Sequence, residues 1–194
     1  LSLEEAERDL GRSEPLVAWG VGCHPRTVRA QAAFDEARFH ALAQRMPFVG
    51  EVGLDPSSRV PMERQLEVFR QALAVAADLR RPVSIHSYWA TRWVLDELHR
   101  QPVAAPILHW WTGNAAETSE AVALGCCFSI HQAVARRSTW HTRVPLERVL
   151  VESDHGYDDP PAAIPCRVQW VEYLAAQQYR LDVAELRREL GKLG

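Results

Sequence analysis

The sequence predicts an α/β fold in which parallel strands alternate with helices. Short apolar segments recur along the 194 residues, and amphipathic segments fit between most of them. This alternation is typical of βαβ units, whose strands pair in parallel. No Pro/Gly/Ser-rich linker or low-complexity segment divides the chain, so we expect a single domain over residues 1–194.

Six segments have the length and the apolar composition of buried strands. They are Val17–His24, Phe48–Leu54, Pro82–His86, Pro106–Trp110, Cys126–Ile130 and Val149–Ser153. The chain opens with Leu1, and the stretch Ser2–Glu7 is typical of the start of a helix. Natural chains normally open with Met, so we expect this sequence to be a fragment or to have a misplaced start.

Two helices between these strands are well marked. From Met62 to Arg80 the apolar residues recur every three to four positions, and Pro61 is placed to open the helix. A second helix is expected over Ala115–Leu124, where Asn114 can cap the start and Gly125 suits the end.

Composition and charge exclude several classes of function. The formal net charge is −3, so the chain lacks the broad positive surface of a sequence-specific DNA-binding protein. An enzyme that holds phosphates through metal ions remains compatible with this charge. No apolar run approaches the length of a membrane span. Cys23, Cys126, Cys127 and Cys166 form no Cys-x-x-Cys pair, which argues against a zinc site and favours the reducing cytoplasm.

Four of the expected strands end in residues that bind divalent metal ions: Glu51, His86, His109 and Asp154. Parallel strands could form an open doubly wound sheet or a (β/α)8 barrel, and the absence of a phosphate-binding glycine signature weakens the first. In a barrel, several strands contribute the active site at their C-terminal ends. Two imidazoles and two carboxylates are a ligand set for Zn²⁺, Mn²⁺ or a related ion. We therefore predict a (β/α)8 barrel with a metal site, of which six strands are visible.

Each of these residues also has a purely structural interpretation. Glu51 could form a salt bridge at a strand end, and Asp154 could cap the following loop. His86 and His109 could be core histidines whose hydrogen bonds are satisfied. Their shared position at the ends of successive strands makes a functional site the better interpretation.

The segments around these residues resemble the TatD family of metal-dependent deoxyribonucleases, a branch of the amidohydrolase-like barrels. The matching segments follow the family's order and are Gly22–Pro25, Gly50–Asp55, Pro82–His86, His109–Gly113 and Val151–Asp154. The most specific of them is Gly-Glu-Val-Gly-Leu-Asp, followed later by a strand-ending His.

The resemblance implies a metal-dependent hydrolase that cleaves phosphodiester bonds in DNA, from an end or in a single strand, with two divalent ions (Mg²⁺, Mn²⁺ or Zn²⁺). Glu51 resembles the carboxylate that bridges the ions, and His86 and His109 resemble ligands of one ion. Asp154 resembles a ligand of the other ion that also helps to orient or deprotonate the attacking water. His24 resembles a residue that contacts the substrate phosphate.

The sequence departs from the family pattern in several places. The family's first strand carries a His-x-His pair that completes one ligand set, and this sequence lacks such a strand, so the barrel could not close as given. Tyr88 stands where the family commonly carries Arg. Trp111 and His155 are placed where they could contact substrate, although Trp111 could equally be packed under a loop. The Ser-Asp-His step is similar to that of the TatD-like component of Qat anti-phage systems.

Two other functions stay open. A hydrolase of the same barrel superfamily could act on C–N or ester bonds, and substrate profiling would separate it from a nuclease. A non-catalytic or partner-dependent protein could retain part of the metal site, which the missing His-x-His pair supports. Cysteine catalysis is disfavoured, because Cys23 and His24 lack a recognisable third partner.

Overall fold

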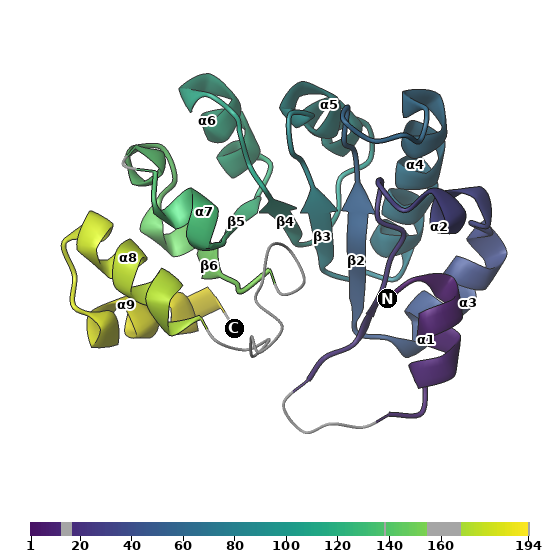
Figure 1. The fold of residues 1–194 in the computed structure, drawn as a ribbon, viewed down its shortest axis with the longest axis horizontal. Helices are drawn as coiled ribbons and strands as arrows, with labels where there is room; N and C mark the ends of the chain where they lie inside the picture. The colour runs from purple at the N-terminus through teal and green to yellow at the C-terminus, as the bar shows by residue number, and fades with distance from the viewer. Residues whose placement is uncertain (13–16, 138, 155–167, 194) are drawn as a thin grey trace. The chain divides into compact units, whose positions relative to one another are not determined.

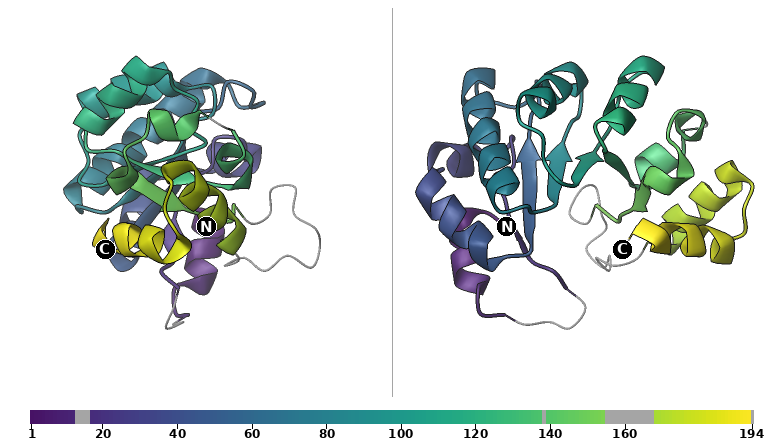
Figure 2. Two further views of the ribbon diagram at one scale, coloured as in Figure 1. Left: turned by 90° about the vertical axis from the view of Figure 1, so that its left-hand side faces the viewer. Right: turned by 180° about the vertical axis from the view of Figure 1, so that it is seen from behind.

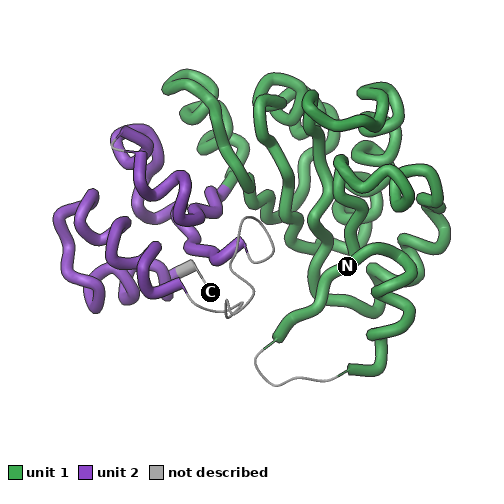
Figure 3. Tube along the Cα trace, viewed as in Figure 1, with its two compact units in different colours: residues 1–126 green, residues 127–194 purple. Residues whose placement is uncertain are grey.

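The computed structural model describes residues 1–12, 17–137, 139–154 and 168–193 (Figure 1). The chain divides into two compact units, residues 1–126 and residues 127–194, and each is described by itself (Figure 3). No described helix combines the length and the hydropathy that a membrane crossing requires.

Within residues 1–12 and 17–126, the first unit has four strands that pair in parallel in the order of the sequence. They are β1 (Gly20–Val21), β2 (Phe48–Gly53), β3 (Val83–His86) and β4 (Pro106–His109). The helices are α1 (Leu3–Asp9), α2 (Val28–Ala32), α3 (Glu36–Arg45), α4 (Met62–Asp78), α5 (Thr91–Arg100) and α6 (Ala115–Ala123). Each strand is followed by at least one helix before the next strand begins, which is the predicted βαβ arrangement.

Helices α4, α5 and α6 follow one another along the strands, as Figure 1 and the right-hand view of Figure 2 show. Charged pairs join these neighbours. Arg70 of α4 donates two hydrogen bonds of 2.8 Å to Glu97 of α5, and Arg92 of α5 donates two to Glu120 of α6, at 2.8 and 2.7 Å. Beneath them, apolar side chains such as Phe69 are fully buried against the strands.

The described residues of the second unit include two parallel strands, β5 (Cys127–Ile130) and β6 (Val149–Val151). Its helices are α7 (Gln132–Ala135), α8 (Gln169–Tyr179) and α9 (Val183–Leu190), with short 3-10 turns at Trp140–Thr142, Leu146–Arg148 and Gly191–Leu193. A bidentate pair from Arg187 to Glu172 ties α9 to α8.

Both predicted helices begin where expected, at Met62 and Ala115, and end slightly earlier than expected, at Asp78 and Ala123. Asn114 accepts a hydrogen bond from the backbone of Glu117, whose side chain accepts one from the backbone of Asn114, so α6 begins with a complete capping box. The predicted strand at Val17–His24 is shorter than expected. Its partner β2 begins at Phe48, opposite Gly20, so pairing cannot extend to earlier residues.

Two glycines allow the strand ends to approach one another closely. A Cβ atom on Gly22 would lie 2.4 Å from the backbone of Gly50, and one on Gly53 would lie 2.3 Å from the carbonyl oxygen of His86. Gly53 also has a φ of 138°, a conformation that other residues rarely adopt. The ends of β1, β2 and β3 can therefore come together only with glycine at these positions.

Replacing Gly53 with Ala should lower the free energy of unfolding by about 2–4 kcal/mol, because the methyl group adds a steric clash to a disfavoured φ. Gly125→Ala is the matched control: Gly125 has a φ of 81°, but a Cβ there would meet no atom within 4 Å. The Gly125→Ala substitution should lower the free energy of unfolding by only about 1–2 kcal/mol. Urea unfolding of both variants measures the difference, and equal losses would show that the close contact at Gly53 is unimportant.

Candidate metal centre

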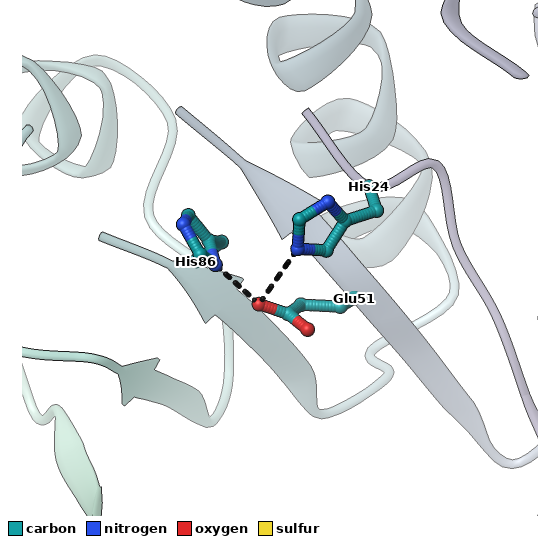
Figure 4. A group of neighbouring side chains, drawn as sticks. All are labelled: His24, Glu51 and His86. Atoms are coloured by element: carbon teal, nitrogen blue, oxygen red, sulfur yellow. Dashed lines mark hydrogen bonds and ion pairs between the residues drawn. The ribbon is translucent and has the colours of Figure 1, made fainter. Parts of the chain in front are cut away.

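The strand ends of the first unit bring four of the predicted site residues together. Glu51 lies on β2, His86 ends β3 and His109 ends β4, while His24 follows β1 by three residues. His86 and His109 are paired across the ladder, so both imidazoles project from the same end of neighbouring strands. Figure 4 shows the side chains of His24, Glu51 and His86 pointing toward one another.

One carboxylate oxygen of Glu51 is the centre of this cluster. Its Oε1 atom lies 2.7 Å from Nδ1 of His86, 3.6 Å from Nε2 of His24 and 3.9 Å from Nε2 of His109. One ligand atom from each of His24, Glu51 and His86 lies within 4.8 Å of the others. Imidazole nitrogens and a carboxylate oxygen at this separation form a group that could hold a divalent ion.

The electrostatics of the cluster favour the forms of these side chains that bind metal ions. Burial raises the pKa of Glu51. Its hydrogen bond with His86 and the nearby charges of His109 and His24 lower the pKa by more than burial raises it, so the pKa lies below its ordinary value. Burial lowers the pKa of His24 by more than the Glu51 charge raises it. Near neutral pH the carboxylate is therefore ionised and the His24 imidazole is neutral, as metal ligation requires.

Asp55 is a further residue of the site, which sequence reasoning did not single out. Its side chain is fully buried, and its Oδ2 atom lies 3.2 Å from Nε2 of His86. Its Oδ1 atom accepts hydrogen bonds from the backbone and the hydroxyl of Ser57, at 2.8 and 2.6 Å. The signal that could have revealed it is an aspartate directly after the apolar end of a strand, at Leu54.

The position of His86 between two carboxylates is the observation that fits a metal ion. A carboxylate only accepts hydrogen bonds, so Nε2 carries a proton toward Asp55. In the neutral imidazole Nδ1 then has a lone pair, and this lone pair faces an oxygen of Glu51 that is also an acceptor. The Nδ1 lone pair and the Glu51 oxygen can face each other favourably only with a second proton or a cation between them. A carboxylate behind a histidine is the usual arrangement around metal sites, where it fixes the tautomer and the ring orientation.

A pocket of about 360 Å³ opens beside this cluster, with His24 and Glu51 in its wall. Its other lining residues are Leu1, Ser2, Glu5, Gly22, Thr27 and Ala30. This volume is within the range of small-molecule sites. A substrate group in the pocket would therefore reach the imidazole of His24 and the free oxygen of Glu51.

The remaining predicted site residues lie elsewhere or outside the described part of the chain. Asp154 belongs to the second unit, three residues after the end of β6, with a φ of 48°. Its place in a shared site with Glu51 stays a prediction. His155 lies outside the described residues. Trp111 is half-buried, and its indole N–H donates a 2.9 Å hydrogen bond to the hydroxyl of Thr118 on α6, so its role in substrate binding also stays a prediction.

Parallel strands that alternate with helices and carry imidazoles and a carboxylate at their C-terminal ends define the class of barrel-type metal-dependent hydrolases. The family profile described as "TatD related DNase" matches residues 3–190. The chain belongs to this family.

Curated relatives agree with this assignment. The chain is 29% identical over 164 residues to the uncharacterized metal-dependent hydrolase YcfH of Escherichia coli, covering 79% of this chain and 61% of that protein. It is 30% identical over 164 residues to the 3'-5' ssDNA/RNA exonuclease TatD of Yersinia pseudotuberculosis, covering 78% of this chain and 63% of the relative. The chain thus spans about three fifths of the length of these relatives.

Solved structures confirm the predicted fold class. The chain superimposes on the TatD homologue YjjV of Escherichia coli with a TM-score of 0.79 at 20% identity, covering 98% of this chain and 79% of that structure. A hydrolase of the TatD family from Entamoeba histolytica gives a TM-score of 0.66 at 14% identity, covering 97% of this chain and 78% of that structure. At these identities the likeness establishes the fold and not the activity, which depends on the residues of the site.

Replacing Asp55 with Asn should lower the affinity for Mn²⁺ or Zn²⁺ by roughly 10- to 100-fold, because the amide no longer fixes the proton of His86 on Nε2. Isothermal titration calorimetry measures the affinity, and ¹⁵N shifts of the imidazole report the tautomer without added metal. The control is Asp78→Asn, since Asp78 faces Nε2 of His40 at 3.1 Å on the exposed surface of the same unit. An unchanged tautomer and affinity in Asp55→Asn would rule out the positioning role.

Proposed function

We propose that the chain is a metal-dependent hydrolase of phosphodiester bonds in DNA, acting as an exonuclease on single-stranded ends with two divalent ions. The observation that carries the proposal is the Glu51 carboxylate oxygen, which three imidazole nitrogens face within 3.9 Å. The name of the Yersinia relative, a 3'-5' ssDNA/RNA exonuclease, supports a nucleic-acid substrate. The name of a human relative that is 26% identical over 164 residues, the 3'-5' RNA nuclease TATDN2, makes RNA the substrate to compare.

Each residue has a proposed role in this reaction. Glu51 would hold both ions, and His86 and His109 would hold one of them. Asp154 would hold the other ion and would help to orient or deprotonate the attacking water. His24, on the pocket side of Glu51 and one-third exposed, contacts the phosphate of the substrate.

Divalent ions at this position would lower the pKa of bound water and neutralise charge on the phosphoryl group. The chain's own residues then do two things. The buried pair of Asp55 and His86 keeps the ligand nitrogen aimed at Glu51, so the site is already organised before substrate binds. His24, whose pKa is lowered, has a neutral imidazole that can hydrogen-bond a phosphate oxygen.

Replacing Glu51 with Gln should reduce the hydrolysis of single-stranded DNA by roughly 10³-fold or more, because a neutral amide cannot bridge two cations. Release of nucleotides from 3'-labelled and 5'-labelled strands measures the rate and the polarity, with RNA strands in parallel. Chelation should abolish the activity, and added Mn²⁺ should restore it.

Glu36→Gln, an exposed carboxylate at the start of α3, is the control for this variant and should retain full activity. Turnover by Glu51→Gln at the wild-type rate would contradict the two-metal mechanism. Hydrolysis of amide or ester substrates, with none of DNA or RNA, would contradict the choice of substrate.

A further inference from the structure

We propose that Trp89, backed by Tyr88 and Trp110, is a stacking surface for an unpaired base of the nucleic-acid strand whose phosphate lies at the metal cluster. This inference rests on the proposed nucleic-acid hydrolase function and adds the element that would hold the strand beside the cluster.

A continuous series of rings leads from the cluster to Trp89. The ring of His86 lies 6.1 Å from that of His109, and the ring of His109 lies 6.2 Å from that of Trp110, between centroids. Tyr88 then lies 5.5 Å from Trp110 and 5.7 Å from Trp89, in edge-to-face contacts of 78° and 71°. These separations are those of favourable aromatic pairs. The series thus joins a predicted metal ligand to a surface ring without a break.

Trp89 is exposed to solvent in a turn, at a position where glycine is the usual residue. The backbone N–H of Ala90 donates to the carbonyl of Ser87 at 3.0 Å, which closes a four-residue turn with Trp89 in its third position. Trp89 has a φ of 54° there, a conformation that turns of this kind usually give to glycine. The fold gains little burial from the side chain, because Trp89 is 67% exposed. A large ring at this position is thus explained by contact with a ligand better than by packing.

The turn holds Trp89 in a defined place beside the site. The hydroxyl of Thr112 accepts a 3.2 Å hydrogen bond from the backbone N–H of Trp89. The hydroxyl of Ser87 donates a 2.7 Å hydrogen bond to the carbonyl of His109. The turn is therefore fastened to the last residue of β4 and to the loop after it, so the backbone of Trp89 is held near the end of that strand.

The chemistry of the surrounding chain favours a base as the occupant. A net charge of −3 does not favour a strand held along its length by contacts between basic side chains and phosphates, so contacts with the bases would add to those of the phosphate at the metal cluster. Stacking on aromatic faces binds every base without regard to sequence, because each base has a π face. An exonuclease that shortens a strand step by step needs such sequence-tolerant contacts next to the phosphate that it cleaves.

The test compares the wild-type protein with Trp89→Gly and Trp93→Ala. Glycine suits the left-handed backbone at position 89, so the melting temperature of Trp89→Gly should not fall. Trp93 lies on α5 and is 45% exposed, which makes it a matched tryptophan outside the ring series. Fluorescence anisotropy measures the binding of a labelled oligo-dT strand with phosphorothioate linkages, and of an abasic strand with the same charge.

The wild-type protein should bind oligo-dT more tightly than the abasic strand. Trp89→Gly should weaken the binding of oligo-dT by roughly 5- to 150-fold and leave that of the abasic strand unchanged. Trp93→Ala should bind both strands as the wild-type protein does. Equal binding of the two strands by the wild-type protein, unchanged binding of oligo-dT by Trp89→Gly, or an equal loss in Trp93→Ala would each overturn the stacking surface.

Hydrolysis of unmodified oligo-dT in the same samples separates this inference from the proposed function. A protein that cleaves DNA but does not distinguish oligo-dT from the abasic strand lacks the stacking surface and keeps the function. A protein that prefers oligo-dT through Trp89 and cleaves neither DNA nor RNA has the surface and lacks the function.

Discussion

The in-register pairing of His86 with His109 across β3 and β4 is the constraint on which the candidate site depends. Paired residues of neighbouring parallel strands project to the same face, so a shift of one residue would send one imidazole to the opposite side of the sheet. Gly53 allows the backbone of β2 to reach His86 closely, which brings Glu51 into the same group. Backbone geometry thus decides which side chains meet before any of them binds an ion.

The charges in this group are stable only because they compensate one another. Asp55 has no exposed surface, and an unpaired carboxylate in that place would be strongly destabilising. Ser57 supplies two hydrogen bonds, His86 supplies a third, and the guanidinium of Arg26 lies 3.7 Å from Oδ2. The same contacts that make burial possible also fix the ring of His86. The stability of the buried Asp55 carboxylate and the orientation of the His86 imidazole therefore depend on the same interactions.

Sequence reasoning predicted the parts of the site that depend on strands. Glu51, His86 and His109 each end an apolar run, and parallel pairing gathers such residues at one edge, where the structure places them. Asp55 was missed because its contact with His86 depends on how the loop after β2 folds back, which no periodicity records. The hydrogen bond from Trp111 to Thr118 likewise depends on the start of α6. The role of Asp154 stays a prediction, because it requires contacts between residues of the two units.

The loop after β2 connects the candidate site to the start of helix α4. The side-chain amide of Gln65, in the first turns of that helix, donates to the carbonyls of Asp55 and Val60, and its oxygen accepts from the backbone N–H of Asp55. A cation that binds only the ordered loop must by reciprocity stabilise that order. Loading of the site would then slow the exchange of the Asp55 amide hydrogen and of its neighbours in α4. The stability of helix α4, which carries none of the proposed ligands, would then depend on whether the metal site is occupied.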